Sequence, residues 1–165
     1  MFEIIKLLLD VCLFKKGPQD VPFSLWLLRV LILVDVCVSF LMVSIHTDWF
    51  PSLLQAIVSA GLIFSFSWFM LYLTNKRQRI NQVTSAFLGT DTLISFFALP
   101  GMASMAFGSA AVLAFIVTIA LMIWHWAVTG HIIRNALGQT WAFSLGLAFL
   151  YLLGSYQVMA FLHLP

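Results

Sequence analysis

This sequence has very little charge for its length. Only 8% of its 165 residues are Asp, Glu, Lys or Arg, whereas soluble domains carry about 25%. Because 62% of the residues are hydrophobic and the mean hydropathy is +1.05, the chain cannot cover itself with a hydrated surface, and its solvent must be lipid. The net charge of +2, without a basic stripe, predicts no nucleic-acid partner.

Recognisable catalytic and cofactor motifs are also missing. The chain has no nucleophile elbow, HExxH, P-loop or GxGxxG. Cys12 and Cys37 lack CxxC or metal-ligand spacing and are interpreted as small buried hydrophobes. Haem ligation by His125 would need the paired intramembrane histidines of membrane cytochromes, which the sequence lacks. We therefore predict no enzymatic activity, no cofactor and no metal site.

Apolar segments long enough to cross a bilayer are abundant. A spanning helix needs about 20 predominantly apolar residues, and five segments satisfy this length, at about 23–45, 51–74, 83–100, 107–130 and 141–162. The predicted fold class is therefore all-α, a single polytopic domain over 23–163 with five transmembrane helices. We expect the third span to end at Pro100-Gly101 and residues 130–135 to form a polar link before the fifth.

The residues before the first span have a different pattern. Glu3, Lys6 and Asp10 follow one another at i, i+3 and i+7, which makes a narrow polar stripe on an otherwise apolar helix. Residues 2–14 are too short to span, so 1–16 are predicted to form an amphipathic helix in the membrane interface. The alternative is a helix folded back against the bundle.

The basic residues predict an orientation. With five spans, all of them fall on one side of the membrane, and the two opposite loops contain none. Cytoplasmic loops are enriched in Lys and Arg, so we predict a cell inner-membrane protein with a cytoplasmic N-terminus and its C-terminus on the opposite side. The basic residues are Lys6, Lys15, Lys16, Arg29, Lys76, Arg77, Arg79 and Arg134.

Two carboxylates lie near the middle of spans. Asp35 belongs to the first span and Asp91 to the third, at similar predicted depth. A charge at the bilayer centre costs roughly 2.5–3.5 kcal/mol on insertion scales, so each needs a partner or a purpose. Asp91 lies on a small, polar stripe that includes Thr84 and Ser95, which places the third span in the middle of the bundle. The two carboxylates either share a proton or bind a cation, or are neutral and hydrogen-bonded to neighbouring helices, and we favour the second interpretation.

Two further polar residues lie within the spans. Arg29 is near the start of the first span and can extend its aliphatic stem back to the interface. His125, between Trp124 and Trp126, is interpreted as an interface anchor, with a proton relay as the alternative.

Small residues at i, i+4 favour helix association. The pairs allow helices to approach closely and are Ala56/Ala60, Gly61/Ser65 and Ala142/Gly146. With no catalytic set and almost no mass outside the membrane, the chain is predicted to be a non-enzymatic accessory or scaffold protein that binds other membrane proteins or itself. The alternative is a small oligomeric proton- or cation-coupled transporter or channel that uses Asp35 and Asp91.

The layout also resembles a known family. Five closely spaced spans, a basic link before the helix with Gly89-Thr90-Asp91 and a link with Gly130 before the last helix resemble the Yip1-type membrane domain. The opening 17–22, GPQDVP, is similar to that of small bacterial inner-membrane proteins sometimes grouped with it. The resemblance implies a helical membrane domain. Rab-GTPase binding, which belongs to eukaryotic members with a long cytosolic N-terminal region, is not carried over.

Overall fold

The computed structural model describes residues 2–106 and 111–162, and this part of the chain is helical without strands. Five helices are long and apolar enough to cross a membrane, which confirms the predicted polytopic helical class. A short helix and two 3-10 turns complete the fold. In chain order the elements are α1 (Phe2–Cys12), η1 (Pro18–Asp20), α2 (Leu25–Val43), α3 (Trp49–Leu73), η2 (Arg77–Arg79), α4 (Ile80–Ala106), α5 (Ala111–Leu137) and α6 (Trp141–Leu162).

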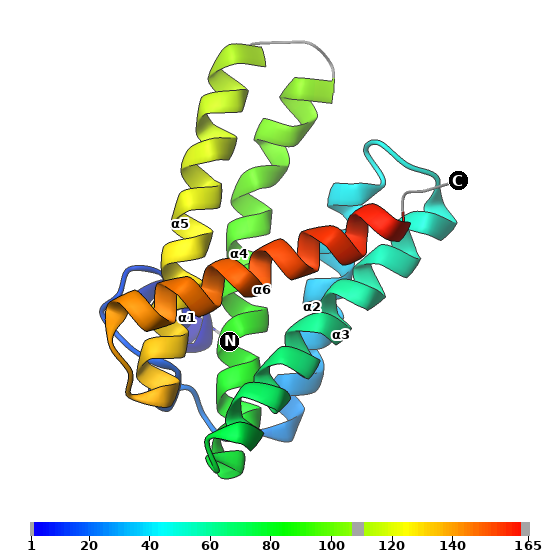
Figure 1. Ribbon diagram of the computed structural model, residues 1–165. Coiled ribbons are helices and arrows are strands. Elements are labelled where there is room, and N and C mark those ends of the chain that lie inside the picture. The colour runs from blue at the N-terminus through cyan, green and yellow to red at the C-terminus, as the bar shows by residue number, and fades with distance from the viewer. Residues whose placement is uncertain (1, 107–110, 163–165) are drawn as a thin grey trace.

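Helix α4 is the centre of the bundle. It packs against α1, α2, α3 and α5, whereas α6 packs against α5 and α3 and passes obliquely in front of them in Figure 1. The small, polar stripe predicted for this segment points inward, because Thr84, Leu88 and Ala98 are buried while Phe96 and Phe97 are exposed. Large side chains on that outer face therefore meet lipid, and small ones allow neighbouring helices to approach.

The predicted end of the third span at Pro100-Gly101 is wrong. Helix α4 continues through Pro100 to Ala106. Proline fixes φ near the helical value and removes one backbone donor, so its presence inside a helix leaves the Phe96 carbonyl without its usual partner. Neighbouring structure in membrane helices tolerates such a loss, and the helix goes on.

The polar link predicted at residues 130–135 is also wrong. Helix α5 runs on to Leu137, and Gly130, Ile132 and Ile133 are buried within it. A Cβ built at Gly130 would lie 2.7 Å from Leu145 Cδ2, so the missing side chain lets α6 approach α5. Glycine serves close packing here and does not break the helix.

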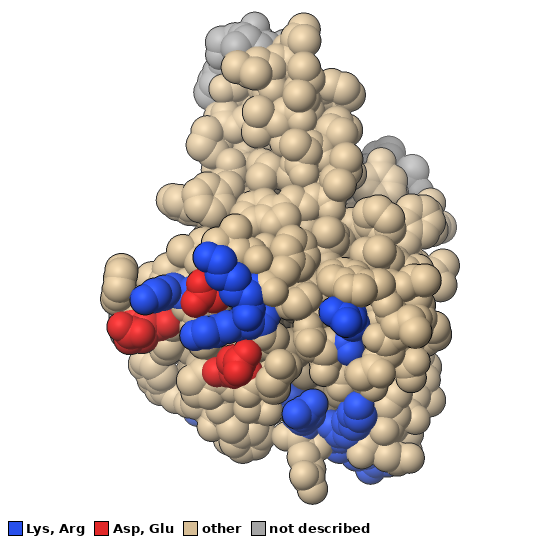
Figure 2. All heavy atoms as spheres, turned by 90° about the vertical axis from the view of Figure 1, so that its left-hand side faces the viewer, with Lys and Arg blue, Asp and Glu red and all other residues tan. Residues whose placement is uncertain are grey.

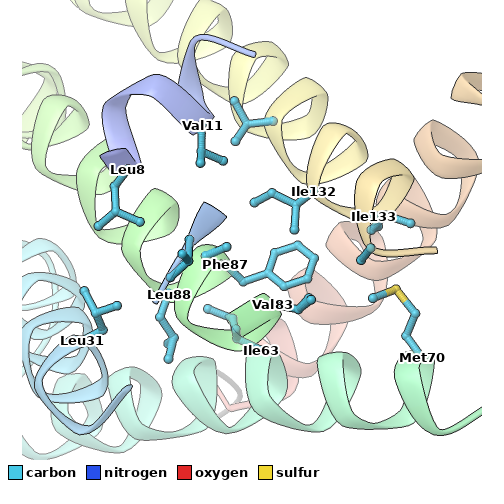
Figure 3. Packing of buried hydrophobic residues seen from close by; sticks show 14 of the residues in the cluster. Leu8, Val11, Leu31, Ile63, Met70, Val83, Phe87, Leu88, Ile132 and Ile133 are labelled. Atoms are coloured by element: carbon cyan, nitrogen blue, oxygen red, sulfur yellow. The ribbon is translucent and has the colours of Figure 1, made fainter. Parts of the chain in front are cut away.

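Helix α1 lies against the bundle. Leu8, Val11 and Cys12 are buried, and Figure 3 shows Leu8 and Val11 directed toward the core formed with α4 and α5. Leu8 covers Gly89, where a Cβ would lie 2.6 Å from its methyl groups. One face of α1 is therefore packed against the bundle, which agrees with the alternative left open by the sequence. That α1 also lies in a membrane interface stays a prediction.

The two cysteines differ in their surroundings. Burial raises the pKa of the Cys12 thiol to about 12. Cys37 was expected to be buried as well, but it is exposed.

On one face of the molecule the charged side chains gather in a single region (Figure 2). On the face shown in Figure 2, Lys, Arg, Asp and Glu lie over the lower half and the upper half is uncharged.

Lys76 connects the segment before α4 to the end of α5. Its Nζ donates to the carbonyl oxygens of Leu137 at 2.8 Å and Ala136 at 3.3 Å, at the C-terminal end of α5. A cation is favourable there because the last carbonyls of a helix lack backbone partners and carry negative partial charge.

We expect Lys76→Met to destabilise the protein by about 1.5–3 kcal/mol, the range for a hydrogen bond that involves a charged group. The loss should appear as a lower midpoint when the purified protein is titrated with a denaturing detergent. Lys15→Met is the matched control, because Lys15 is exposed and no hydrogen bond or ion pair of its side chain is found in the described structure. Equal midpoints for the two variants would show that the Lys76 contacts contribute nothing.

Candidate functional site

The main polar contact inside the bundle joins α4 and α5. His125 Nε2 lies 3.2 Å from Asp91 Oδ1, and the side chains are 28% and 17% exposed. Asp91 is near the middle of α4, and His125 is near the middle of α5. A histidine and a carboxyl group at this distance can hold one exchangeable proton between them, either as an ion pair or as two neutral groups.

Asp35 on α2 is fully buried beside this pair. Its Oδ1 lies 3.0 Å from the Thr92 hydroxyl oxygen, which is also 2.7 Å from the Leu88 carbonyl oxygen. The hydroxyl has a single hydrogen and therefore cannot donate fully to both neighbours. When it donates to Leu88, the contact with Asp35 is favourable only if the carboxyl group donates to Thr92.

Asp35 is also a neighbour of Asp91. Asp35 Oδ2 is buried and has no hydrogen-bond partner among the described residues, and the Asp91 carboxyl group is close enough to interact with Asp35 electrostatically. Two neighbouring carboxyl groups repel when both are ionised, and protonation of one of them removes this repulsion. The structure thus brings together Asp35, Asp91 and His125 from three helices, in a continuous set with Thr92.

The surroundings of His125 differ from those of an interface anchor. The indole N–H of Trp124 donates to the Cys12 carbonyl at 3.0 Å, and that of Trp126 donates to the Leu145 carbonyl at 2.9 Å. Both tryptophans therefore bind α1 and α6 through their polar atoms. His125, between them in sequence, contacts Asp91 instead.

A cavity of about 410 Å³ reaches this set of side chains. It extends from the turn after α2, where His46 and Thr47 line it, to Asp91 and His125 in the middle of the bundle. Its lining comes from α2, α3, α4, α5, α6 and the α2–α3 turn and contains three ionisable or titratable groups, several hydroxyl groups, one amide and three thioethers. The lining residues are Ser39, Met42, Val43, His46, Thr47, Gln55, Ala56, Ser59, Asp91, Ser95, Met102, His125 and Met159.

Arg29, the fourth polar residue singled out within the spans, does not join the cluster. It is exposed on α2 and is not part of the cavity lining. Its side chain can therefore extend toward the interface, as its position in the sequence suggests.

Sequence reasoning missed His131. This buried residue on α5 has Nε2 2.9 Å from the Lys16 carbonyl, which makes Nε2 the protonated nitrogen, and Phe14 packs edge-on at 5.2 Å. Asn135 donates to the His131 carbonyl at 2.9 Å. The sequence did contain a signal for it. His131 and Asn135 are four residues apart, which places them on one face of a helix that continues past Gly130. These contacts attach the segment after α1 to α5 and lie apart from the cavity.

Together these features define a multi-pass helical membrane protein with a cavity between its helices that is lined by both polar and apolar side chains. Within this class, no family model, curated protein or solved structure matches the chain. The resemblance to the Yip1-type domain stays a prediction, and function has to be argued from the site itself.

Proposed function

We propose that this protein is a small proton-coupled transporter of the membrane in which it resides, the alternative raised by the sequence. The observation that supports it is the contact of His125 with Asp91 in the lining of this cavity. Ionisable groups inside a membrane domain are unfavourable and are typical of proton relays and ion pathways. An accessory protein that acts only through its outer surface has no need of a cavity lined by a carboxyl group and an imidazole.

The arrangement gives each group a role in moving a proton. Asp91 and His125 are both partly exposed to the cavity, so a proton can reach them from there. Asp35 is fully buried and next to Asp91, so it can accept that proton and return it. Binding of a cation beside Asp91 would favour its ionised form and release the proton, which couples the two movements.

Reconstitution into sealed vesicles tests this proposal. With a pH-sensitive dye inside, Na⁺, K⁺, Ag⁺ and choline are added outside in turn, and the lumenal pH is recorded; cation entry in exchange for protons makes the lumen more alkaline. In a second arm, a valinomycin-imposed potassium potential without an added cation measures uncoupled proton leak, which should equal that of protein-free vesicles. We expect a pH change well above that of protein-free vesicles with at least one added cation. Traces equal to those of protein-free vesicles with every cation, or proton flux in the second arm alone, would overturn the proposal.

We further propose that the membrane is the cell inner membrane, with α1 cytoplasmic and the end of α6 on the opposite side. Support comes from the eight basic residues, which fall before α2 or near its start, between α3 and α4, and at the end of α5. A reporter active only in the cytoplasm is expected to work when fused near Lys76 and to fail after α6. The reverse result would invert the orientation.

The accessory or scaffold role remains a second candidate, with a specific observation in its favour. The predicted small-residue contacts are used unequally: Ala56 and Ala60 are buried, whereas Cβ atoms built at Gly61, Gly146 and Gly154 would have nothing within 4 Å. These open positions on α3 and α6 suit association with another helix or a second copy. Measuring the mass of the protein in mild detergent tests self-association, and a strictly monomeric, partner-free protein would count against this role.

A further inference from the structure

The cavity is unusually rich in sulfur. Three of the seven methionines in the chain, Met42, Met102 and Met159, line it, and they come from α2, α4 and α6. His46 joins them from the turn between α2 and α3. Residues that are distant in sequence thus bring three thioethers and one imidazole to the same space.

These groups lie near the ends of their helices. Met42 is next to the last residue of α2, Met159 is in the last turn of α6, and Met102 is near the end of α4. Met102 follows Asp91 by eleven residues, about 16 Å along an ideal helix. Met42 is nearer to the Asp91–His125 pair, because it also lines a smaller neighbouring cavity together with His125.

The chemistry of the lining selects among possible occupants. Thioethers are soft, uncharged ligands that favour soft metal ions such as Cu(I), and imidazole also suits copper. Hard cations such as Ca²⁺ and Mg²⁺ prefer several oxygen ligands with charged carboxylates. Asp91 is the only carboxylate in the described lining. The three methionines and His46 therefore suit a soft monovalent ion better than a hard divalent one.

An organic cation fits less well. Quaternary ammonium groups and similar ligands are recognised by aromatic rings through cation–π contacts. The chain contains 16 Phe, 6 Trp and 3 Tyr, yet none of them is among the described residues that line this cavity. Methionine is the apolar residue used there, together with Val43 and Ala56.

We propose that Met42, Met102 and Met159, together with His46, bind a soft monovalent metal ion of the Cu(I) class. The sequence did not indicate a metal site because the three methionines are 57 to 60 residues apart and form no metal-ligand spacing. The proposal that the ion binds is argued from the cavity lining and does not require transport. The further statement that the ion is the transported substrate rests on the function proposed above.

Equilibrium dialysis of the purified protein with Ag⁺ in chloride-free buffer tests the site, because Ag⁺ is a redox-stable ion of the same class. Cys12 and Cys37 are replaced by alanine in every sample, since thiols bind Ag⁺. The test variant is Met42→Leu with Met102→Leu and Met159→Leu, and Leu is close to Met in volume. The matched control changes Met70, Met105 and Met122 to Leu, which removes the same number of thioethers from outside this lining. Because Met122 lines a smaller cavity together with Met42, Met70→Leu with Met105→Leu is measured beside it.

We expect saturable binding of one Ag⁺ per protein, at least a tenfold loss of affinity in the test variant, and no comparable loss in the control. Size-exclusion profiles and helical circular dichroism establish that each variant is folded. An additional His46→Gln variant should weaken binding without affecting the fold. Absence of binding by the parent protein, or equal losses in the test and control variants, would overturn the site.

The vesicle experiment separates this inference from the proposed function. Ag⁺ binding without any flux would leave the site standing and reject transport. Proton-coupled flux of Na⁺, K⁺ or choline without Ag⁺ binding would support transport and reject the metal site.

Discussion

Asp91→Asn is expected to lower proton-linked flux to the level of protein-free vesicles while the protein stays folded. Asparagine has nearly the shape of aspartate and still donates and accepts hydrogen bonds, but it cannot take up or release a proton at neutral pH. The contact with His125 Nε2, 3.2 Å from Asp91 Oδ1, can therefore persist while the relay is interrupted. Flux is measured in the vesicle assay after matching protein content and orientation.

Asp48→Asn is the control for this result. Asp48 is exposed just before α3, and no hydrogen bond of its side chain to α3 is found at the start of that helix, so its loss removes the same charge outside the cavity. Asp91→Glu restores a titratable group and should recover part of the flux. Undiminished flux in folded Asp91→Asn would reject the relay and leave Asp91 a structural hydrogen-bonding group.

Gly130→Leu is expected to be strongly destabilising. A Cβ there would lie 2.7 Å from Leu145 Cδ2 and 3.5 Å from Leu145 Cα, so a larger side chain would enter the space that the α6 backbone occupies. Overpacking costs about 1–3 kcal/mol and occasionally more. We expect a clear drop in the detergent-denaturation midpoint, with Gly130→Ala showing a smaller drop, because the methyl groups of Leu145 can move.

Gly154→Leu provides the matched control, since a Cβ at Gly154 would have nothing within 4 Å. Its denaturation midpoint should remain close to that of the parent protein. Leu145→Ala combined with Gly130→Leu should recover part of the lost stability by returning volume. Similar midpoints for Gly130→Leu and Gly154→Leu would show that the approach of α5 and α6 is not close.

The number and nature of the spanning helices could be predicted because hydropathy over about 20 residues depends on the bilayer and not on tertiary contacts. The similar depth of Asp35 and Asp91 could be predicted for a similar reason, although the favoured interpretation gave each carboxyl group its own partner on a neighbouring helix. Both lie near the centres of their spans, and a charge at that depth seeks a polar partner. Depth is a property that a single sequence specifies well.

The partner of Asp91 could not be predicted, because it depends on where helices end. Taking Gly130 as the end of the fourth span put His125 close to the interface, where an anchor between tryptophans was the natural interpretation. Helix α5 in fact runs from Ala111 to Leu137, so His125 is near its middle and level with Asp91. Glycine and proline are strong local signals for an end, but α6 packed on Gly130 outweighs that signal.

Pro100 divides α4 into two segments that can differ in flexibility. It lies in α4 between Asp91 and Met102, and without its backbone donor the Phe96 carbonyl is not tied to the next turn. Prolines are the commonest sites of sharp helix bending. The segment of α4 after Pro100, which carries Met102, can therefore bend relative to the first half of the helix, which is packed inside the bundle. Bending at Pro100 would move Met102 relative to Asp91, because the two residues lie on opposite sides of the proline.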